Sequence, residues 1–193
     1  MAARTPKLTR ERVLDAALAL VDDEGLDALS MRRVGAALGV EAMSLYHHVP
    51  SKAALLDGVH ERVLLSVEEP PRSSSWRAYA RHQALALQAA LLRHPHAVPL
   101  FATRPAATPA SIERLGRHLE VLERAGFTPA RAIMLVQLTL QLVVGHVMWV
   151  TAPPAPVDYA RAPAAVRRAA RAPYDPDEEL RRGLDALLAG FHP

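Results

Sequence analysis

The sequence predicts an all-α protein in which a three-helix helix-turn-helix head at the N-terminus precedes a larger helical domain. Ala, Leu and Arg, which favour helices, dominate the composition, and the alternation of β-branched residues typical of strands is almost absent. Prolines cluster at 70–71, 95–109, 153–163 and 173–176, where they separate apolar segments with helical spacing. Two short apolar segments meet at Gly39, and a tight glycine turn of this kind is typical of a helix-turn-helix.

Capping residues mark where the helices of the head begin and end. A hydroxyl side chain before an apolar segment satisfies free backbone N–H groups, and glycine or proline ends a helix. The expected elements are a helix from Thr9 to Gly25, one from Ser30 to about Leu38, a short helix over 41–48 that Pro50 ends, and a fourth helix after Ser51.

The rest of the chain carries the same kinds of signal, with proline at the first helical position in several places. We expect a helix over 76–93, an irregular one near Pro95 and Pro99, helices after Thr108-Pro109 and Thr128-Pro129, a short basic helix near 163–171, and a last helix after Asp175-Pro176. The chain then divides into a helix-turn-helix head over 1–52, a connecting helix and hinge over 53–72, and a second domain over 73–193.

Composition excludes several kinds of chemistry. The chain has no Cys, which removes disulfides, thiolate catalysis and Cys-based zinc sites. Residues 1–7 are polar and lack the apolar run of a signal peptide, so we expect a cytoplasmic protein. The formal net charge is only +3, but basic residues gather in 1–12 and 28–55, on either side of an acidic cluster at 22–27. The head therefore has two small positive spots that suit phosphate groups.

Residues 30–52 have the pattern of a helix pair that reads DNA. Apolar side chains are spaced for burial on both sides of Gly39. The side chains facing away from that core are compact and uncharged, which suits base edges, thymine methyl groups and phosphate oxygens; they are Ala42, Met43, Ser44, Tyr46, His47 and His48. The alternative is an ordinary helical hairpin within a bundle, in which Tyr46 packs against the first helix.

The residues of this head resemble one known family. The segment LTRERVLDAALALVDDEGLDALSMRRVGAALGVEAMSLYHHVPSKAALLDGV is similar to the DNA-binding head of the tetracycline-repressor (TetR) family. Its most specific part is G-V-x-x-x-x-L-Y-x-H-V-x-x-K, from Gly39 to Lys52. The segment ATRPAATPASIERLGRHLEVLERAGFTPARAI resembles the next domain of the tetracycline-binding members. The resemblance covers about residues 8–150, and the last helix matches in kind.

The resemblance implies a homodimeric transcriptional repressor that binds palindromic double-stranded operator DNA and is released by a small apolar effector. Carried over residue by residue, it places Ala42, Met43, Ser44, Tyr46 and His47 in the major groove, Arg32 on a base or phosphate, and Tyr46, His48 and Lys52 on phosphates. Related repressors have Gln-Pro where this chain has Ala42-Met43, and Trp where it has His47. We therefore expect a different operator sequence with the same docking.

Residues 129–151 form a run of roughly 20 mostly apolar residues, long enough to span a bilayer. We reject a membrane span because polar side chains, including Gln137 and His146, lie near its middle. A helix that is apolar on nearly all sides is instead buried on several sides. Gln137 and Gln141 share a face with Met134 and Met148, which suits either a ligand cavity or amide groups that bond to each other or to a neighbouring helix.

The resemblance also indicates what kind of ligand to expect. Leu100 replaces a magnesium-binding His of the tetracycline-binding members, and Trp149 replaces a Glu that holds a metal-bound water. Gln83 and Leu87 replace a pocket amide and an aromatic side chain. We therefore expect an apolar, metal-free ligand and no cofactor. The expected lining residues are Gln83, Leu87, Leu100, Phe101, Arg104, Met134, Gln137, Gln141 and Trp149. Arg104 either pairs with an anionic group on the ligand or caps a nearby helix end.

Two other functions fit parts of the sequence. A helical enzyme is the first, but we find no Ser-His-Asp arrangement, metal-ligand spacing or phosphate loop, so we expect no enzymatic activity. An activator is the second, and the sequence does not separate it from a repressor. For a dimer, we expect an interface that combines part of 129–151 with the last helix, through Leu180, Leu184, Leu187 and Leu188. The segment 153–173 is then a flap over the pocket mouth.

Overall fold

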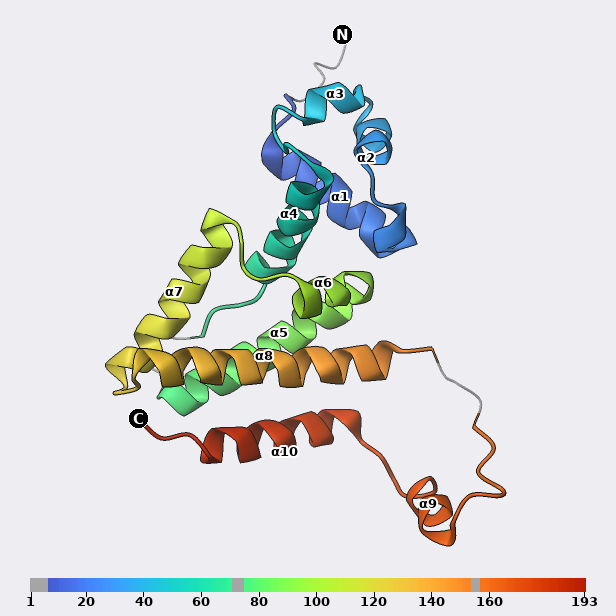
Figure 1. Ribbon diagram of the computed structural model, residues 1–193, viewed down its shortest axis with the longest axis vertical. Coiled ribbons are helices and arrows are strands. Elements are labelled where there is room, and N and C mark those ends of the chain that lie inside the picture. The colour runs from blue at the N-terminus through green and yellow to red at the C-terminus, as the bar shows by residue number, and fades with distance from the viewer. Residues whose placement is uncertain (1–6, 71–74, 154–156) are drawn as a thin grey trace.

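The computed structural model describes residues 7–70, 75–153 and 157–193, and those residues form helices and loops without any strand (Figure 1). The predicted all-α class, with a helix-turn-helix head and a larger helical C-terminal part, is confirmed. The α-helices are α1 (Arg10–Glu24), α2 (Met31–Leu38), α3 (Ala42–Leu45), α4 (Lys52–Leu65), α5 (Trp76–Arg93), α6 (Val98–Thr103), α7 (Pro109–Arg124), α8 (Pro129–Thr151), α9 (Ala164–Ala169) and α10 (Pro176–Ala189). Residues 1–6, 71–74 of the predicted hinge and 154–156 of the predicted flap lie outside the described residues.

The predicted caps begin the helices as expected. Each capping side-chain oxygen accepts a hydrogen bond from a backbone N–H of the first turn, which removes one unsatisfied donor. These caps are Thr9, Ser30, Ser51, Thr108, Thr128 and Asp175. The turn of the helix-turn-helix uses Gly39 with φ of 68°, a left-handed conformation that favours glycine.

Helix α3 is shorter than the predicted 41–48. The structure has α-helix only over Ala42–Leu45, and hydrogen-bonded turns continue the chain to His48. The backbone N–H groups of His48 and Val49 both donate to the Leu45 carbonyl, at 2.9 and 2.8 Å. This tightening brings Val49, which is 2% exposed, into the core of the head.

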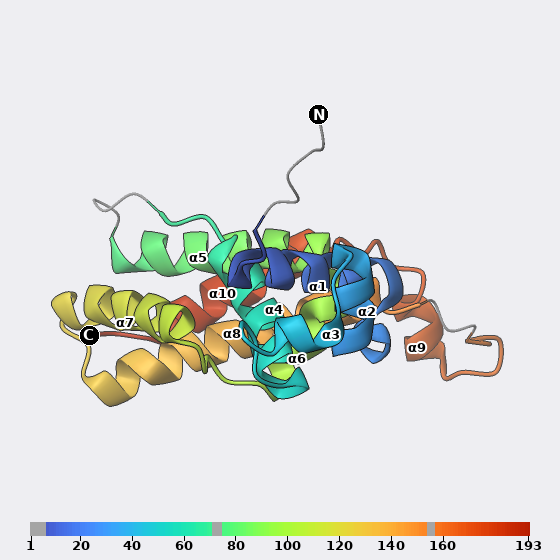
Figure 2. The ribbon, with the colours of Figure 1, turned by 90° about the horizontal axis from the view of Figure 1, so that it is seen from above.

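The head packs on α4, and α4 continues into the body. In Figure 1, α2 and α3 lie at the top, and α4 descends from the head toward the level of α5, α6 and α8. Viewed from above, the head covers the middle of the body (Figure 2). Helix α4 contacts α1 in the head and α5, α6 and α7 in the body. Its apolar side chains Leu55, Val59 and Val63 are fully buried.

Helix α8 is the long central helix of the body. It is long and apolar enough to cross a membrane by length and composition. In this fold it contacts α5, α6, α7 and α10, and its remaining side is exposed. Figure 1 shows α8 lying across the body with α10 running beside it.

Polar contacts hold the head to α4 and to the body. Within the head, the Arg10 guanidinium donates two hydrogen bonds to the buried Glu61 carboxylate of α4, at 2.6 and 2.9 Å. These bonds lower the pKa of Glu61 despite its burial. Between head and body, Asp22 at the end of α1 pairs with His94 Nδ1 at 2.9 Å, and its backbone carbonyl accepts from His96 Nδ1 at 2.9 Å.

Gly58 marks the closest packing of α1 on α4, and its replacement tests that packing. A Cβ at Gly58 would overlap the Leu14 side chain, which is fully buried, whereas a Cβ at Gly116 in α7 would meet open space. We expect Gly58→Ala to lower the free energy of unfolding by about 1 kcal/mol, because overpacking outweighs the gain in helix propensity. Gly116→Ala should raise it slightly. Urea denaturation of both variants measures the difference, and a stabilised Gly58→Ala would contradict the packing.

Candidate functional site

The outer surface of the head carries the residues predicted to read DNA. Met43 is 73% exposed, Tyr46 and His47 are exposed, and Ser44 and His48 are half-buried. Ala42 is also half-buried, because it packs against the core and lies close to Gly35 of α2. A Cβ at Gly35 would lie 2.9 Å from the Val40 carbonyl oxygen, so the turn between α2 and α3 requires glycine there. The sequence analysis did not identify this requirement.

Two cations flank this uncharged surface. Arg32 lies in the first turn of α2 and Lys52 is the first residue of α4, and both side chains are exposed. The neighbouring Arg33 instead pairs with Glu24 of α1. Along the chain, the uncharged side chains of α3 lie between these two exposed positive groups, which suits a helix in a groove with phosphates nearby.

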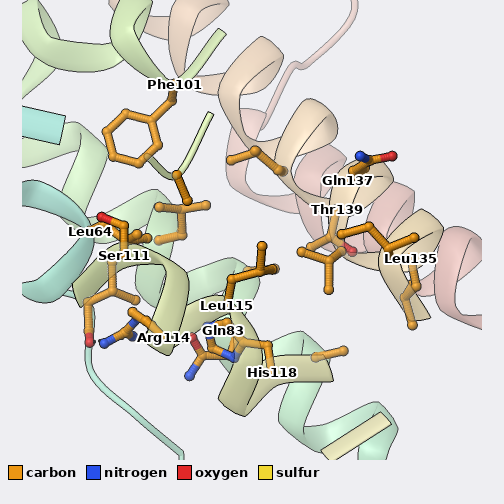
Figure 3. Close-up of a pocket in the computed structure, with 18 of the residues that line it drawn as sticks. Leu64, Gln83, Phe101, Ser111, Arg114, Leu115, His118, Leu135, Gln137 and Thr139 are labelled. Atoms are coloured by element: carbon orange, nitrogen blue, oxygen red, sulfur yellow. Dashed lines mark hydrogen bonds between the residues drawn. The ribbon is translucent and has the colours of Figure 1, made fainter. Parts of the chain in front are cut away.

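A cavity of about 270 Å³ lies in the body between α4, α5, α6, α7 and α8. Most of its walls are apolar, and Figure 3 shows Leu64, Phe101, Leu115 and Leu135 around it. Five of the nine predicted lining residues do line it: Gln83, Leu87, Phe101, Arg104 and Gln137. A mostly apolar cavity with a few polar groups is typical of small-molecule sites.

The other four predicted residues do not line the cavity. Leu100 is buried in the core rather than at the cavity wall. Met134, Gln141 and Trp149 are exposed, because they lie on the side of α8 that faces away from the body. The sequence showed α8 to be apolar on nearly all sides, and such a helix gives no signal for which side faces the cavity.

Arg104 reaches the cavity, but its charge is already paired. Its guanidinium donates to Asp57 Oδ1 of α4 at 2.5 Å and to the Ala53 carbonyl at 3.5 Å. The structure therefore supports neither expected role, a free partner for a ligand anion or a cap on a helix end. The pair instead ties the chain after α6 to α4.

One wall of the cavity is polar, and the sequence analysis missed most of it. Arg114 of α7 is 3% exposed and donates to the Val67 carbonyl at 2.8 Å and to Gln83 Oε1 at 3.4 Å. The Tyr79 hydroxyl is hydrogen-bonded to His118 Nδ1. The spacing of Arg114 and His118 with Leu115 and Leu122 on one face of α7 was the available signal.

Burial decides the charge of the ionisable groups in this cavity. Desolvation lowers the pKa of His118 to about 4, with the Arg114 charge adding to the effect. Burial also lowers the pKa of His60 and raises that of Tyr79. These three side chains are therefore neutral near pH 7. His60 of α4 stacks on Phe101 of α6, with ring centroids 4.2 Å apart, so it joins the cavity to the helix that supports the head.

The exposed side of α8 forms a regular, mostly apolar stripe that includes one amide side chain, Gln141. Successive members are separated by four, three, four and three residues, which is the spacing of a helix–helix seam; they are Met134, Leu138, Gln141, Gly145 and Met148. Trp149 continues the stripe and is 73% exposed. Within the described ranges, no group of three or more His, Asp or Glu side chains is arranged to hold a metal ion.

Comparisons with known families match both parts of the chain. The model described as bacterial regulatory proteins, tetR family, matches residues 13–59. The model described as tetracyclin repressor-like, C-terminal domain, matches residues 69–176.

Curated relatives include transcriptional repressors. The chain is 36% identical over 142 residues to the HTH-type transcriptional repressor DrrR1 of Streptomyces coeruleorubidus, a match that covers 72% of this chain and 53% of that protein. It is 30% identical over 201 residues to the tetracycline repressor protein class C of Escherichia coli, covering 96% of this chain and 91% of the repressor.

Solved structures of similar proteins include ligand complexes. Apo ActR from Streptomyces coelicolor superposes with a TM-score of 0.82 and 27% identity, over 97% of this chain and 96% of ActR. ActR in complex with actinorhodin gives a TM-score of 0.77 and 26% identity, over 95% and 96% of the two chains. A single-substitution variant of TetR from Acinetobacter baumannii AYE, in complex with minocycline, superposes with a TM-score of 0.76 and 27% identity. The match covers 95% of this chain and 93% of that chain.

The neutral state of His118 makes stability depend on pH. The unfolded chain binds this proton near pH 6.5 and the folded chain only near pH 4, so the unfolded state holds more protons in between. The stability that the neutral imidazole contributes is therefore fully present above pH 6.5, and it is lost as the pH falls toward 4. We expect the free energy of unfolding to fall by about 2 kcal/mol from this group between about pH 7 and about pH 5.

Denaturation at both pH values, at one protein concentration, measures this loss. His118→Gln should reduce it, because glutamine keeps a polar partner for Tyr79 without a titrating proton. His47→Gln removes an exposed imidazole and should keep the wild-type difference. An unchanged difference in His118→Gln would contradict a buried neutral His118.

Proposed function

The chain belongs to the TetR family of bacterial regulatory proteins, and we propose that it is a ligand-responsive repressor. In this proposal it binds a palindromic operator as a homodimer and releases it when a small, largely apolar molecule enters the cavity. One observation carries this proposal. Helix α4 buries one side in the head and lines the cavity with His60 and Leu64. Whatever fills the cavity therefore contacts the helix that sets the position of the head.

We propose that α3 enters the major groove. The support is geometric: α3 presents compact, uncharged side chains at the surface, with cations on either side. The proposed DNA contacts are Arg32, Ala42, Met43, Ser44, Tyr46, His47, His48 and Lys52. Because Ala42 is half-buried, we assign it close backbone approach and methyl contact rather than a reaching side chain.

Release then follows from a shift between two states. Two heads on a palindrome must lie one helical turn apart, about 34–36 Å, to enter successive major grooves. A ligand derepresses only if it binds the released state more tightly than the DNA-bound one. The stack of His60 on Phe101 and the pair of Arg104 with Asp57 connect the cavity walls to α4. Relatives solved with actinorhodin and with minocycline support a small organic ligand of this general kind.

The same proposal covers the remaining features of the chain. We propose a division into the head, the connecting segment 53–72 and the C-terminal domain. In support, the match to the first family model ends at residue 59 and the match to the second begins at residue 69. A regulator without catalytic activity that acts on DNA belongs in the cytoplasm. We propose that the homodimer buries the α8 stripe against α8 and α10 of a second copy, as a four-helix bundle. Leu180, Leu184 and Leu188, which we expected at this interface, are instead buried within one chain, where α10 packs on α8 and α5, so α10 would contribute other side chains.

Replacing Lys52 tests the docking on DNA. If its ammonium group contacts a phosphate, Lys52→Ala should weaken binding to DNA taken from upstream of the protein's own gene. It should also reduce the slope of log affinity against log salt by about 1. Fluorescence anisotropy at several salt concentrations measures both. Arg124→Ala, which removes an equal charge from the last turn of α7, should leave the slope unchanged. An unchanged slope in Lys52→Ala would count against the phosphate contact.

Replacing Gly145 tests the dimer interface. A Cβ at Gly145 meets open space within one protomer, so Gly145→Arg leaves the fold of a single chain intact. In the proposed bundle the same side chain would meet the second copy. We expect Gly145→Arg to sediment as a monomer and to lose operator binding. Gly116→Arg, at an equally open position of α7, should remain dimeric. A dimeric Gly145→Arg would place the interface elsewhere.

A further inference from the structure

We propose that the cavity selects an apolar organic acid, and that the acid's anionic group binds the guanidinium of Arg114. This inference rests on the proposed function, because it names the chemical class of the effector that enters the same cavity. It differs from the expectation for Arg104, whose charge is paired with Asp57.

The charge of Arg114 is only partly balanced within the protein. Its side chain is 4% exposed, and a guanidinium stays protonated even when burial lowers its pKa. Its closest partners, the Val67 carbonyl and the Gln83 amide oxygen, are neutral. The carboxylate of Glu69 lies 3.6 Å away, is 52% exposed, and lies closer to Arg117, at 3.1 Å. A shared, solvated carboxylate compensates a buried cation only in part.

Free hydrogen-bonding atoms around the cavity point to the same conclusion. Over the part of the chain that the structure describes, buried polar side-chain atoms without a hydrogen-bond partner are few, and they include Arg114 Nε and Thr139 Oγ1. Both residues line the cavity, Arg114 from α7 and Thr139 from α8 (Figure 3). A buried donor without an acceptor costs free energy. Both atoms lie behind the cavity surface, so a ligand oxygen removes that cost only where a small shift of the side chains brings it within hydrogen-bond distance.

The other groups in the cavity favour an anion attached to an apolar body. Tyr79 and His118 lie beside Arg114 and are neutral near pH 7, so they add hydrogen-bonding capacity without an opposing charge. The remaining walls are mainly Leu, Val and Phe side chains, which would leave a bare inorganic anion without partners on most sides. A carboxylate on an apolar skeleton satisfies both parts of the cavity.

A matched pair of fluorescent probes tests this selectivity without knowledge of the natural ligand. Anilinonaphthalene sulfonate and phenylnaphthylamine share an apolar ring system, but only the first carries an anionic group. Both are titrated into the full-length protein at neutral pH in the absence of DNA. We expect the sulfonate to bind at least about tenfold more tightly, as for a charge-assisted hydrogen bond in a largely apolar site. Equal affinities, or no binding of either probe, would overturn the proposal.

Three variants test whether Arg114 causes the preference for the sulfonate probe. Arg114→Met should remove the preference for the sulfonate while phenylnaphthylamine binds as before. Arg124→Met, which removes an exposed guanidinium from the last turn of α7, should keep the preference. Glu69→Gln removes the competing carboxylate at a half-exposed position, so it should strengthen sulfonate binding several-fold even if Arg114→Met folds poorly. Unchanged sulfonate binding in Glu69→Gln, or a preference that survives in folded Arg114→Met, would contradict the proposal.

The test of the acid site can succeed or fail independently of the proposed repressor function. Probe binding is measured without DNA, so a protein that ignores its operator can still show the Arg114-dependent preference. In that case the acid site is correct and the repressor assignment is wrong. If instead the protein binds its operator and releases it with neutral ligands only, the repressor assignment is correct and the acid site is wrong.

Discussion

Helix α4 must be buried on two sides at once, and the rest of the structure depends on that constraint. Leu55 and Val59 enter the core of the head, whereas His60 and Leu64 reach the cavity. Protein interiors are close-packed, so under the proposed mechanism a change at the cavity wall would move α4 as a body. The bond of Glu61 to Arg10 ties α4 to the first turn of α1 in the head.

The cavity shows how residue chemistry, and not burial alone, sets the charge of an interior. His60 and His118 lose their protons when they are desolvated, and so they behave as neutral hydrogen-bonding groups. Arg114 cannot do so and keeps its charge in the same surroundings. One wall of the cavity is therefore electrically distinct from the others, and under the proposed acid site this asymmetry would give a bound molecule a preferred orientation.

Local signals in the sequence predicted the helix starts, because a cap such as Thr9 or Ser51 acts within one turn of the backbone. The side of α8 that meets the cavity was not predictable, since its apolar residues surround the helix. Trp149 and Gln141 were therefore placed in the cavity and are exposed. Arg114 was missed for a different reason: an arginine on a helix is ordinarily solvated, and only tertiary packing shows that this one is buried.

The surface proposed to read DNA and the interior that folds the head use different residues. Met43 and His47 are exposed and contribute little to the core, whereas Gly35 and Gly39 fix the turn behind them. Substitutions at exposed positions usually change stability little. Evolution can therefore alter which promoter such a protein controls through a few codons of α3. A duplicated gene would keep an intact sensor while its new copy acquired a different set of target genes.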